Sequence, residues 1–273
     1  MTTNTYGVGI GWRPEIAGFV ADLPGLRFAE VVAESVLARG DLPFGLGELR
    51  DRGVAIVPHG VRLSLGGAEP VEPARVEHLA AVADRLGAPL VSEHIAYVRA
   101  NGVEAGHLLP IPRSREAVDA VVANVRRAQA ALSVPIALEP IAALFDWPDD
   151  ELDEGAFLTE ILERTGALLL LDVANVYANA LNRGTDPLAL LDRLPLDRIA
   201  YVHVAGGAEH AGIYHDTHTD PVPRPVLDLV TALCERARPP ALMLERDGDY
   251  PSAADLRAEL DAIAEASGYP AVT

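Results

Sequence analysis

Short runs of apolar residues recur along the chain, and most of them are almost uninterrupted by polar positions. Runs of this kind are typical of parallel strands that are buried on both faces. We therefore expect strands at residues 6–12, 27–34, 54–60, 89–97, 135–140, 167–176, 198–206 and 241–247.

Between most of these runs lie stretches with apolar residues at three- and four-residue spacing, the period of an amphipathic helix. Several begin at Ser or Asp and end at Gly or in basic residues, which are ordinary helix boundaries. The expected helices cover residues 72–87, 114–132, 153–166, 186–194, 224–237 and 252–268.

Eight strands that alternate with helices predict a (β/α)₈ TIM barrel of the α/β class, formed by residues 1–273 as a single domain. An open doubly wound sheet is the rival architecture. It lacks support, because no G-x-G-x-x-G motif follows the first expected strand.

Carboxylate and imidazole side chains stand near the C-terminal ends of the expected strands, and in a barrel these ends meet on one face. Many lie in apolar surroundings, where an unpaired charge is costly to bury. A bound cation is the simplest compensation, because Arg246 is the only arginine expected at these ends. The residues are Glu34, His59, Glu93, His94, Glu139, Asp172, Asn175, His203 and Glu245.

The segment YHDTHTD, residues 214–220, follows the seventh expected strand and adds Asp216 and His218. The ligand-type residues are then His59, His94, Glu139, Asp172, Asn175, His203, Asp216, His218 and Glu245. One octahedral metal takes six ligands at most, so this set predicts two or three metals with bridging carboxylates such as Glu139 and Glu245. Histidine and carboxylate without cysteine suit iron, zinc or manganese.

Several of these residues also have purely structural interpretations. His203 is compatible with a satisfied core histidine and His59 with a strand-end cap. Asp172 and Asn175 are compatible with capping the next helix. Glu93 is expected to point away from the site, because neighbouring strand residues face opposite sides.

The remaining candidates carry less weight. His210 and His215 lie in a loop near the site and are expected either to gate it or to support its ligands. His78 and His107 are given no role, and the single cysteine, Cys234, is expected to be a buried apolar residue of a helix.

The charge of the chain narrows the classes of partner. It has 40 acidic residues against 22 basic ones, all arginine, and a formal net charge of −18. So negative a surface disfavours nucleic acid as a partner, and the lack of lysine excludes Schiff-base chemistry. No apolar run is long enough for a membrane helix, and the N-terminus lacks the layout of a secretory signal. We therefore expect a cytoplasmic protein without a membrane partner.

The ordered motifs PHG, SEHIAY, LLPIP, LEP, LDVANVY, YVHVAG, DTH and LERD resemble those of the DUF692 (UPF0276) family, the multinuclear non-heme iron-dependent oxidative enzymes. The resemblance implies a xylose-isomerase-like barrel that holds two or three irons in mixed Fe(II) and Fe(III) states and uses O₂ as co-substrate. It also implies a ribosomal precursor peptide as the substrate, modified at Cys, or at Asp or Asn, in natural-product (RiPP) biosynthesis. A second protein would recognise the leader of that peptide.

Carried over by position, the resemblance implies three metal positions, held by His59, His94 and Glu139, by Asp172, His203 and Glu245, and by Asn175, Asp216 and His218. Residues expected to support the ligands or to contact substrate are His215, His210, Glu34 and Arg246. One position departs from the family, since Pro140 follows Glu139 where many relatives have Asn.

Three other functions stay open at this point. The ligand order also resembles endonuclease IV, a trinuclear zinc phosphodiesterase, although Asn175 stands where that group has His and the chain lacks a basic surface. A divalent-metal sugar isomerase or epimerase would leave the surplus histidines unexplained. A non-catalytic metal-dependent scaffold has no positive feature in the sequence.

Overall fold

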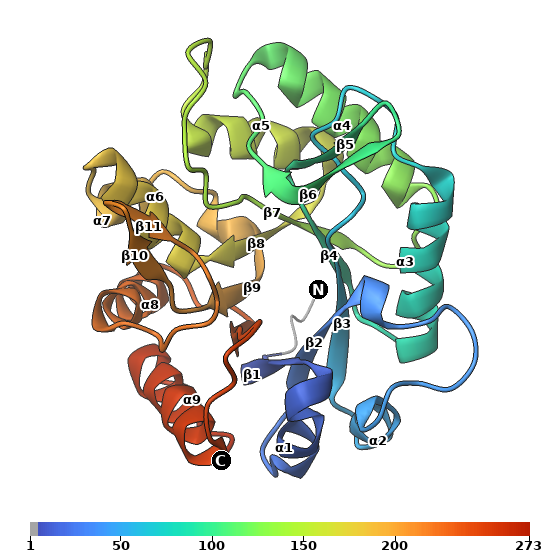
Figure 1. The fold of residues 1–273 in the computed structure, drawn as a ribbon, viewed down its shortest axis with the longest axis vertical. Helices are drawn as coiled ribbons and strands as arrows, with labels where there is room; N and C mark the ends of the chain where they lie inside the picture. Colours follow the sequence, from blue (N-terminus) through green and yellow to red (C-terminus); the bar gives the residue numbers. More distant parts are fainter. Residues whose placement is uncertain (1–4) are drawn as a thin grey trace.

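Eight parallel strands close into a barrel in the computed structural model, which describes residues 5–273 (Figure 1). The order around the barrel is β1-β12-β9-β8-β7-β4-β3-β2. The strands are β1 (Gly7–Trp12), β2 (Phe28–Val32), β3 (Ala55–Gly60), β4 (Val91–His94), β7 (Ile136–Glu139), β8 (Leu168–Asp172), β9 (Ile199–Val204) and β12 (Ala241–Leu244). The predicted TIM barrel is confirmed, and the first four residues of the predicted domain, 1–273, lie outside the described part.

Helices follow the barrel strands and surround the barrel (Figure 1). They are α1 (Ala17–Asp22), α2 (Leu46–Asp51), α3 (Pro73–Leu86), α4 (Arg115–Gln129), α5 (Glu154–Thr165), α6 (Val173–Arg183), α7 (Pro187–Leu191), α8 (Arg224–Arg236) and α9 (Ala253–Ser267), with short 3₁₀ helices at Pro14–Ile16, Ala33–Ser35 and Leu196–Arg198. Ser114, Asp153 and Ser252 cap α4, α5 and α9 as the sequence predicts. Within residues 5–273, no helix combines the length and the apolar character that a membrane crossing requires.

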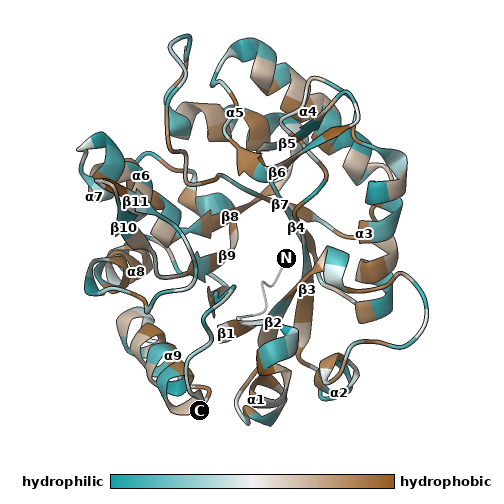
Figure 2. Cartoon of the chain, in the orientation of Figure 1, coloured by the Kyte–Doolittle hydropathy of each residue, from teal (hydrophilic) through white to brown (hydrophobic). Residues whose placement is uncertain are grey.

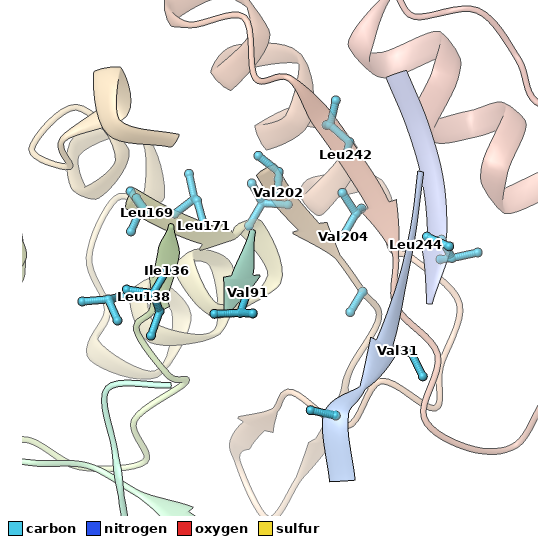
Figure 3. Close-up of a cluster of buried hydrophobic side chains, with 14 of the residues drawn as sticks. Val31, Val91, Ile136, Leu138, Leu169, Leu171, Val202, Val204, Leu242 and Leu244 are labelled. Atoms are coloured by element: carbon cyan, nitrogen blue, oxygen red, sulfur yellow. The ribbon is translucent and has the colours of Figure 1, made fainter. Parts of the chain in front are cut away.

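Side chains alternate between two cores along the strands. On β8, Leu169 and Leu171 belong to the large core between strands and helices, whereas Leu170 belongs to a smaller core inside the barrel. Figure 3 shows residues of the large core along the strands, including Val202 and Val204 on β9. The helices present hydrophobic as well as hydrophilic stretches, as expected for a layer with one buried face (Figure 2). Inward and outward positions are thus fixed by the two-residue period of each strand.

The expected strand at 167–176 is wrong in its second half. β8 ends at Asp172, and α6 begins at Val173. Asp172 ends the strand because its Oδ1 accepts hydrogen bonds from the backbone N–H groups of Ala174 and Asn175, which caps the new helix. Asn175 consequently lies in the first turn of α6 and not on a strand.

Two hairpins outside the barrel were not predicted (Figure 1). They are β5 (Tyr97–Ala100) with β6 (Val103–Leu109), and β10 (Ala208–His210) with β11 (Ile213–His215). The first turns at Asn101 and Gly102, both with positive φ, and Asn-Gly is a strong signal for a two-residue hairpin turn. The expected strand at 89–97 therefore merges the barrel strand β4 with the start of this hairpin.

Candidate metal centre

The inward positions of the barrel change from apolar to polar toward the C-terminal strand ends. On β9, Tyr201 is followed two residues later by His203, and on β8, Leu170 is followed by Asp172. His203 and Asp172 are 0% and 1% exposed. Because the strands run in parallel, the same step on each strand brings its polar side chain to one level inside the mouth of the barrel.

Four overlapping groups of side chains place their ligand atoms within 4.8 Å of one another, close enough to hold metal ions. The groups are His59, His94 and Glu139; Glu139, Asp172 and His203; Glu30, His203 and Glu245; and Asp172, His218 and Glu245. Four residues belong to two groups each, the carboxylates Glu139, Asp172 and Glu245 and the imidazole His203. Sharing of this kind suits carboxylates that bridge adjacent metal ions.

Several buried ligand atoms of these groups lack partners within the described chain. Glu139 Oε2, Asp172 Oδ2, His203 Nδ1 and Glu245 Oε2 make no hydrogen bond to any residue of 5–273. His203 Nδ1 and Glu245 Oε2 lie 2.7 Å apart but do not have hydrogen-bond geometry. Unpaired buried polar atoms are costly, and atoms that converge without bonding each other are satisfied by a cation placed between them. The donor set, imidazole and carboxylate, therefore fits metal ions such as iron, zinc or manganese.

Carboxylates and imidazoles in the cluster hold each other in charged forms. Burial alone would lower the pKa of His94, but the carboxylates of Glu139 and Glu93 raise it to about 9. Burial alone would raise the pKa of Glu139, but the rings of His203 and His94 lower it to about 2. Without metal ions, protonated imidazoles supply the positive charge that the buried carboxylates need.

In two side chains, His59 and Asp172, burial outweighs the attraction of opposite charges and favours the neutral form. Burial lowers the pKa of His59, which keeps this ring neutral, the form that binds a metal. Burial and the neighbouring carboxylate of Asp216 raise the pKa of Asp172 well above its usual value. Since His218 lies near both carboxylates, at 2.6 Å from Asp216 and 3.7 Å from Asp172, one imidazole serves two acids. A cation at this point would relieve the repulsion.

An arginine that the sequence reasoning missed contributes to the charge balance. Arg13 directly follows β1 and is 8% exposed. Its guanidinium lies 3.4 Å from Glu245 Oε1 and 2.6 Å from Asp247 Oδ1. The expectation that Arg246 is the only arginine at the strand ends is therefore wrong. The signal was present as an arginine before a proline at the end of the first strand, in GWRPE.

A buried chain of hydrogen bonds connects two of the candidate ligands behind the cluster. His59 Nδ1 lies 2.8 Å from Ser92 Oγ, and this hydroxyl lies 2.6 Å from the Tyr201 hydroxyl. Tyr201 donates to Glu30 Oε2 at 2.5 Å, and Glu30 Oε2 lies 2.8 Å from His203 Nε2. Each ring is thereby held by one nitrogen, which leaves its other nitrogen facing the cluster.

Glu30 is the residue of β2 that reaches the cluster, in place of the expected Glu34. Both stand at the same parity in RFAEVVAE, so alternation alone does not separate them. β2 ends at Val32, and Glu34 lies in a 3₁₀ helix, where its Oε1 accepts from the Val61 N–H at 3.2 Å. Glu34 lines a separate cavity of about 290 Å³, so the structure does not bring it to the cluster.

The segment 214–220 reaches the cluster because its backbone is held between two strand ends. The His218 N–H donates to Gly206 O after β9, and the Asp247 N–H after β12 donates to His218 O, both at 3.0 Å. His218 adopts φ +54°, an uncommon conformation for a residue with a side chain. Asp247 Oδ2 lies 3.2 Å from His218 Nδ1 and holds this ring as Glu30 holds His203.

A cavity of about 690 Å³ opens above the cluster. His94, Glu139, Asn175, Asp216 and His218 form its floor and side, and His215 on β11 lines it as well. Asn175 is held by its amide, which donates to the Pro140 carbonyl at 3.1 Å, while its buried Oδ1 has no partner among residues 5–273.

The other predicted residues lie elsewhere. His210 is exposed on β10, with its ring centroid 6.2 Å from that of His215. Arg246 is buried but turns to Glu259, at 2.6 Å, away from the cluster. Glu93 points outward as expected, and its Oε2 accepts from the backbone N–H groups of Arg62 and Leu63.

Known proteins resemble this chain in sequence and in fold. The sequence model of a family described as RiPP precursor modification enzyme MbnB/TglH/ChrH matches residues 7–267. A UPF0276 protein of Streptomyces avermitilis is 54% identical over 269 residues, which cover 96% of this chain and 55% of that protein. The chain thus spans about half the length of this relative.

Two solved structures share the barrel. A xylose isomerase domain protein from Planctomyces limnophilus has a TM-score of 0.60 at 15% identity, over 96% of this chain and 97% of that one. Endonuclease IV from Thermus thermophilus has a TM-score of 0.60 at 18% identity, over 95% and 99%. At such identities the likeness shows the fold alone, and it confirms the expected xylose-isomerase-like barrel.

Metal binding is expected to release protons, because His94 with a pKa of about 9 is protonated at neutral pH and a metal needs the neutral ring. The affinity should therefore rise as the pH increases toward 9. Calorimetric titration of the metal-free protein with Zn²⁺ at pH 7.5, in two buffers of different ionisation enthalpy, measures the number of protons released. Heats that do not depend on the buffer would contradict the protonated state.

Gly206→Ala is expected to reduce the number of bound metal ions while the barrel remains folded. A Cβ at this position would lie closer than 3.0 Å to the backbone oxygens of Asp220 and Pro221, so the segment that carries Asp216 and His218 must move. Elemental analysis and circular dichroism check this. Gly18→Ala is the matched control, since its Cβ would meet nothing within 4 Å. Full metal content in Gly206→Ala would show that this segment is not needed.

Tyr201→Phe is expected to weaken metal binding by roughly ten- to hundredfold, the usual effect of losing a group that orients a ligand. It removes the hydroxyl that joins Ser92 to Glu30. Competition with a chelator measures the change. Tyr269→Phe removes a buried hydroxyl bonded to Pro239 O and should leave metal affinity unchanged. Equal affinities in both variants would assign the chain of hydrogen bonds to packing alone.

Proposed function

The chain belongs to the UPF0276 family of RiPP precursor modification enzymes, and from this premise we propose that it is a multinuclear iron enzyme that uses O₂ to modify a ribosomally made precursor peptide oxidatively. The modified residue in this proposal is a cysteine. The observation that carries it is the overlap of the ligand groups, in which Glu139, Asp172 and Glu245 are each shared. A mononuclear site would not need shared carboxylates.

In the proposal, the metal positions are those that the family resemblance implies. The distances support His59, His94 and Glu139 as one position, since the Glu139 carboxylate lies 3.6 Å from His59 Nε2 and 3.3 Å from His94 Nε2. Glu139 Oε1 lies 3.4 Å from His203 Nδ1, so the same carboxylate faces a second position.

Glu245 has the corresponding role on the other side. Its Oε2 lies 2.7 Å from His203 Nδ1 and 3.5 Å from His218 Nδ1. These distances support Glu245 as a ligand between His203 and His218. The second position at Asp172, His203 and Glu245 and the third at Asn175, Asp216 and His218 are taken from the family resemblance. His218 Nε2 lies near Asp172 and Asp216. His218 Nδ1 lies near Glu245 and Asp247. Only one of the two nitrogens would bind a given metal ion.

Iron bound here would supply one-electron oxidation with O₂ and a Lewis acid that lowers the pKa of a substrate thiol. The chain supplies the surroundings. Arg13 offsets the charge of Glu245 from behind. Ile141, Leu144 and Phe145 give the cavity an apolar side. The protein's own thiol takes no part, because Cys234 lies on α8 and burial raises its pKa.

Pro140 positions the Asn175 side chain at the edge of the site. As an imino acid it has no N–H to donate, and its carbonyl accepts the Asn175 amide at 3.1 Å. This contact directs Asn175 Oδ1 to the cavity. The proposal also includes a separate protein that binds the peptide leader, no nucleic-acid partner given the net charge of −18, and a cytoplasmic location beside the ribosomal substrate.

Anaerobic purification followed by elemental analysis, with Mössbauer spectroscopy of iron-57-enriched protein, tests the proposal. The expected result is two or three irons per chain in mixed ferrous and ferric states. His94→Ala and Asp172→Ala should lose most of the metal, because each removes a ligand from one or more of the overlapping groups. His78→Ala is the control, since its ring contacts the Ala33 carbonyl outside the cluster.

Stoichiometric zinc without redox-active iron would overturn the oxidative proposal. In that case hydrolysis becomes the alternative, and abasic DNA is the substrate to assay. Wild-type metal content in either ligand variant would remove that residue from the cluster.

A further inference from the structure

Exposed apolar side chains gather at one place beside the metal cavity. Ten large apolar side chains are exposed among residues 5–273, and five of them lie on the β5–β6 hairpin or on the segment between β7 and α5. These five are Val103, Leu109, Leu144, Phe145 and Trp147, which are 38–70% exposed. Single exposed apolar side chains are common on protein surfaces, whereas a group of them in one place marks a binding surface.

Five of the side chains around this place enclose a groove of about 650 Å³, named here the hairpin groove. Tyr97, Val103 and Leu109 from the hairpin form one wall, and Phe145 and Trp147 form the other. The two walls are mostly apolar, and Glu69, Arg99 and Glu104 add charges to the lining. The volume is sufficient for one or two bulky side chains with their backbone.

The aromatic wall is held in place by contacts of its own. The Trp147 indole N–H donates to Pro110 O at 3.1 Å, and the Phe145 and Trp147 rings meet edge to face with centroids 5.5 Å apart. Asp146 between them pairs with Arg113 at 2.9 Å and Arg183 at 2.8 Å. A fixed wall loses little conformational entropy when it binds a ligand.

The hairpin groove continues into the metal cavity. Leu109, Pro110 and Phe145 line both. A chain that delivers one residue to the cluster therefore has its neighbouring residues next to the groove. Within residues 5–273, β5 and β6 pair only with each other, so the hairpin also offers backbone groups to an extended strand.

We propose that the hairpin groove binds a bulky apolar side chain, preferably aromatic, of the substrate peptide, in an extended segment adjacent to the residue that enters the metal cavity. This rests on the proposed function, since it takes the occupant to be the peptide. The shared wall favours a peptide over a second copy of the chain. An extended peptide can pass from the groove into the metal cavity, whereas the surface of a folded protein does not enter it.

The test measures binding and not turnover. The probes are fluorescein-labelled, glycine-rich nonapeptides with one central Cys and one Phe placed one to four residues before or after it. Anisotropy is recorded anaerobically with the metal-loaded protein. At one preferred spacing, Phe should strengthen binding by about tenfold or more over Gly, the gain expected for burying one aromatic side chain. Equal binding at every spacing would overturn the proposal.

A second peptide set with Ser in place of Cys separates the groove from the cluster. The gain from Phe should persist in this set, whatever metal the cluster holds and whether or not oxidation occurs. If the metal analysis contradicts an iron enzyme, this gain still decides whether the groove selects apolar side chains.

Variants that line only the groove complete the test. Trp147→Ala and Val103→Glu should abolish the gain from Phe and retain the bound metal, whereas Trp147→Phe, which keeps a ring, should retain most of the gain. Phe44→Ala is the control, because Phe44 is 70% exposed and lines a different cavity. An unchanged gain in Trp147→Ala and Val103→Glu would overturn the proposal. So would a dimer that Val103→Glu dissociates, since it would assign the groove to a second copy.

Discussion

The structure depends on how the negative charge at the mouth of the barrel is compensated. The carboxylates of Glu30, Glu139, Asp172 and Glu245 are 0–4% exposed, in a region where each isolated charge would cost several kcal/mol. Arg13 compensates part of this charge from one side. Imidazoles compensate the rest, and the pKa values of His94 and Glu139, about 9 and about 2, reflect this pairing. Metal ions would replace protons at these imidazoles and would supply positive charge in the same place.

This exchange has a consequence for folding. Small zinc domains fold only when metal is bound, because they have little other core. Here the barrel has two cores of its own, and the hydrogen bonds through Ser92, Tyr201 and Glu30 position His59 and His203 without metal. These two rings are therefore held by hydrogen bonds that need no metal, whereas His94 Nδ1 has no hydrogen-bond partner among residues 5–273. The segment at His218, with its positive φ, is held by backbone contacts that a cation at Asp216 would reinforce.

The sequence predicted the barrel and the convergence of strand-end residues such as His59, Glu139 and His203, because both follow from the two-residue period of apolar strands with polar ends. The prediction was wrong where the end of a strand, or a contact between distant residues, determines which side chain reaches the cluster. Asp172 ends β8 by capping α6, so its own carboxylate serves the helix with Oδ1 and leaves Oδ2 to the cluster. The sequence predicted Glu34 and not Glu30, because both have the same parity and only the end of β2 separates them. Arg13 and Asp247 follow the first and the last barrel strand, more than 200 residues apart, so the arginine in GWRPE indicates a charge at a strand end but not the carboxylates that it contacts.

The proposed chemistry and the proposed selection of peptides belong to different parts of the molecule. Most of the cluster is built on barrel strands, where packing on both faces fixes the ligands, and His218 is added by the segment 214–220. The hairpin groove is built on β5–β6 and on the segment before α5. Both lie outside the barrel, so their side chains can change without disturbing a barrel strand. Leu109, Pro110 and Phe145 are shared by both cavities, so in the two proposals a change of the groove lining alters which peptide reaches the metals and leaves the ligands in place. A barrel that works in this proposed way would keep one kind of reaction and direct it to different peptides.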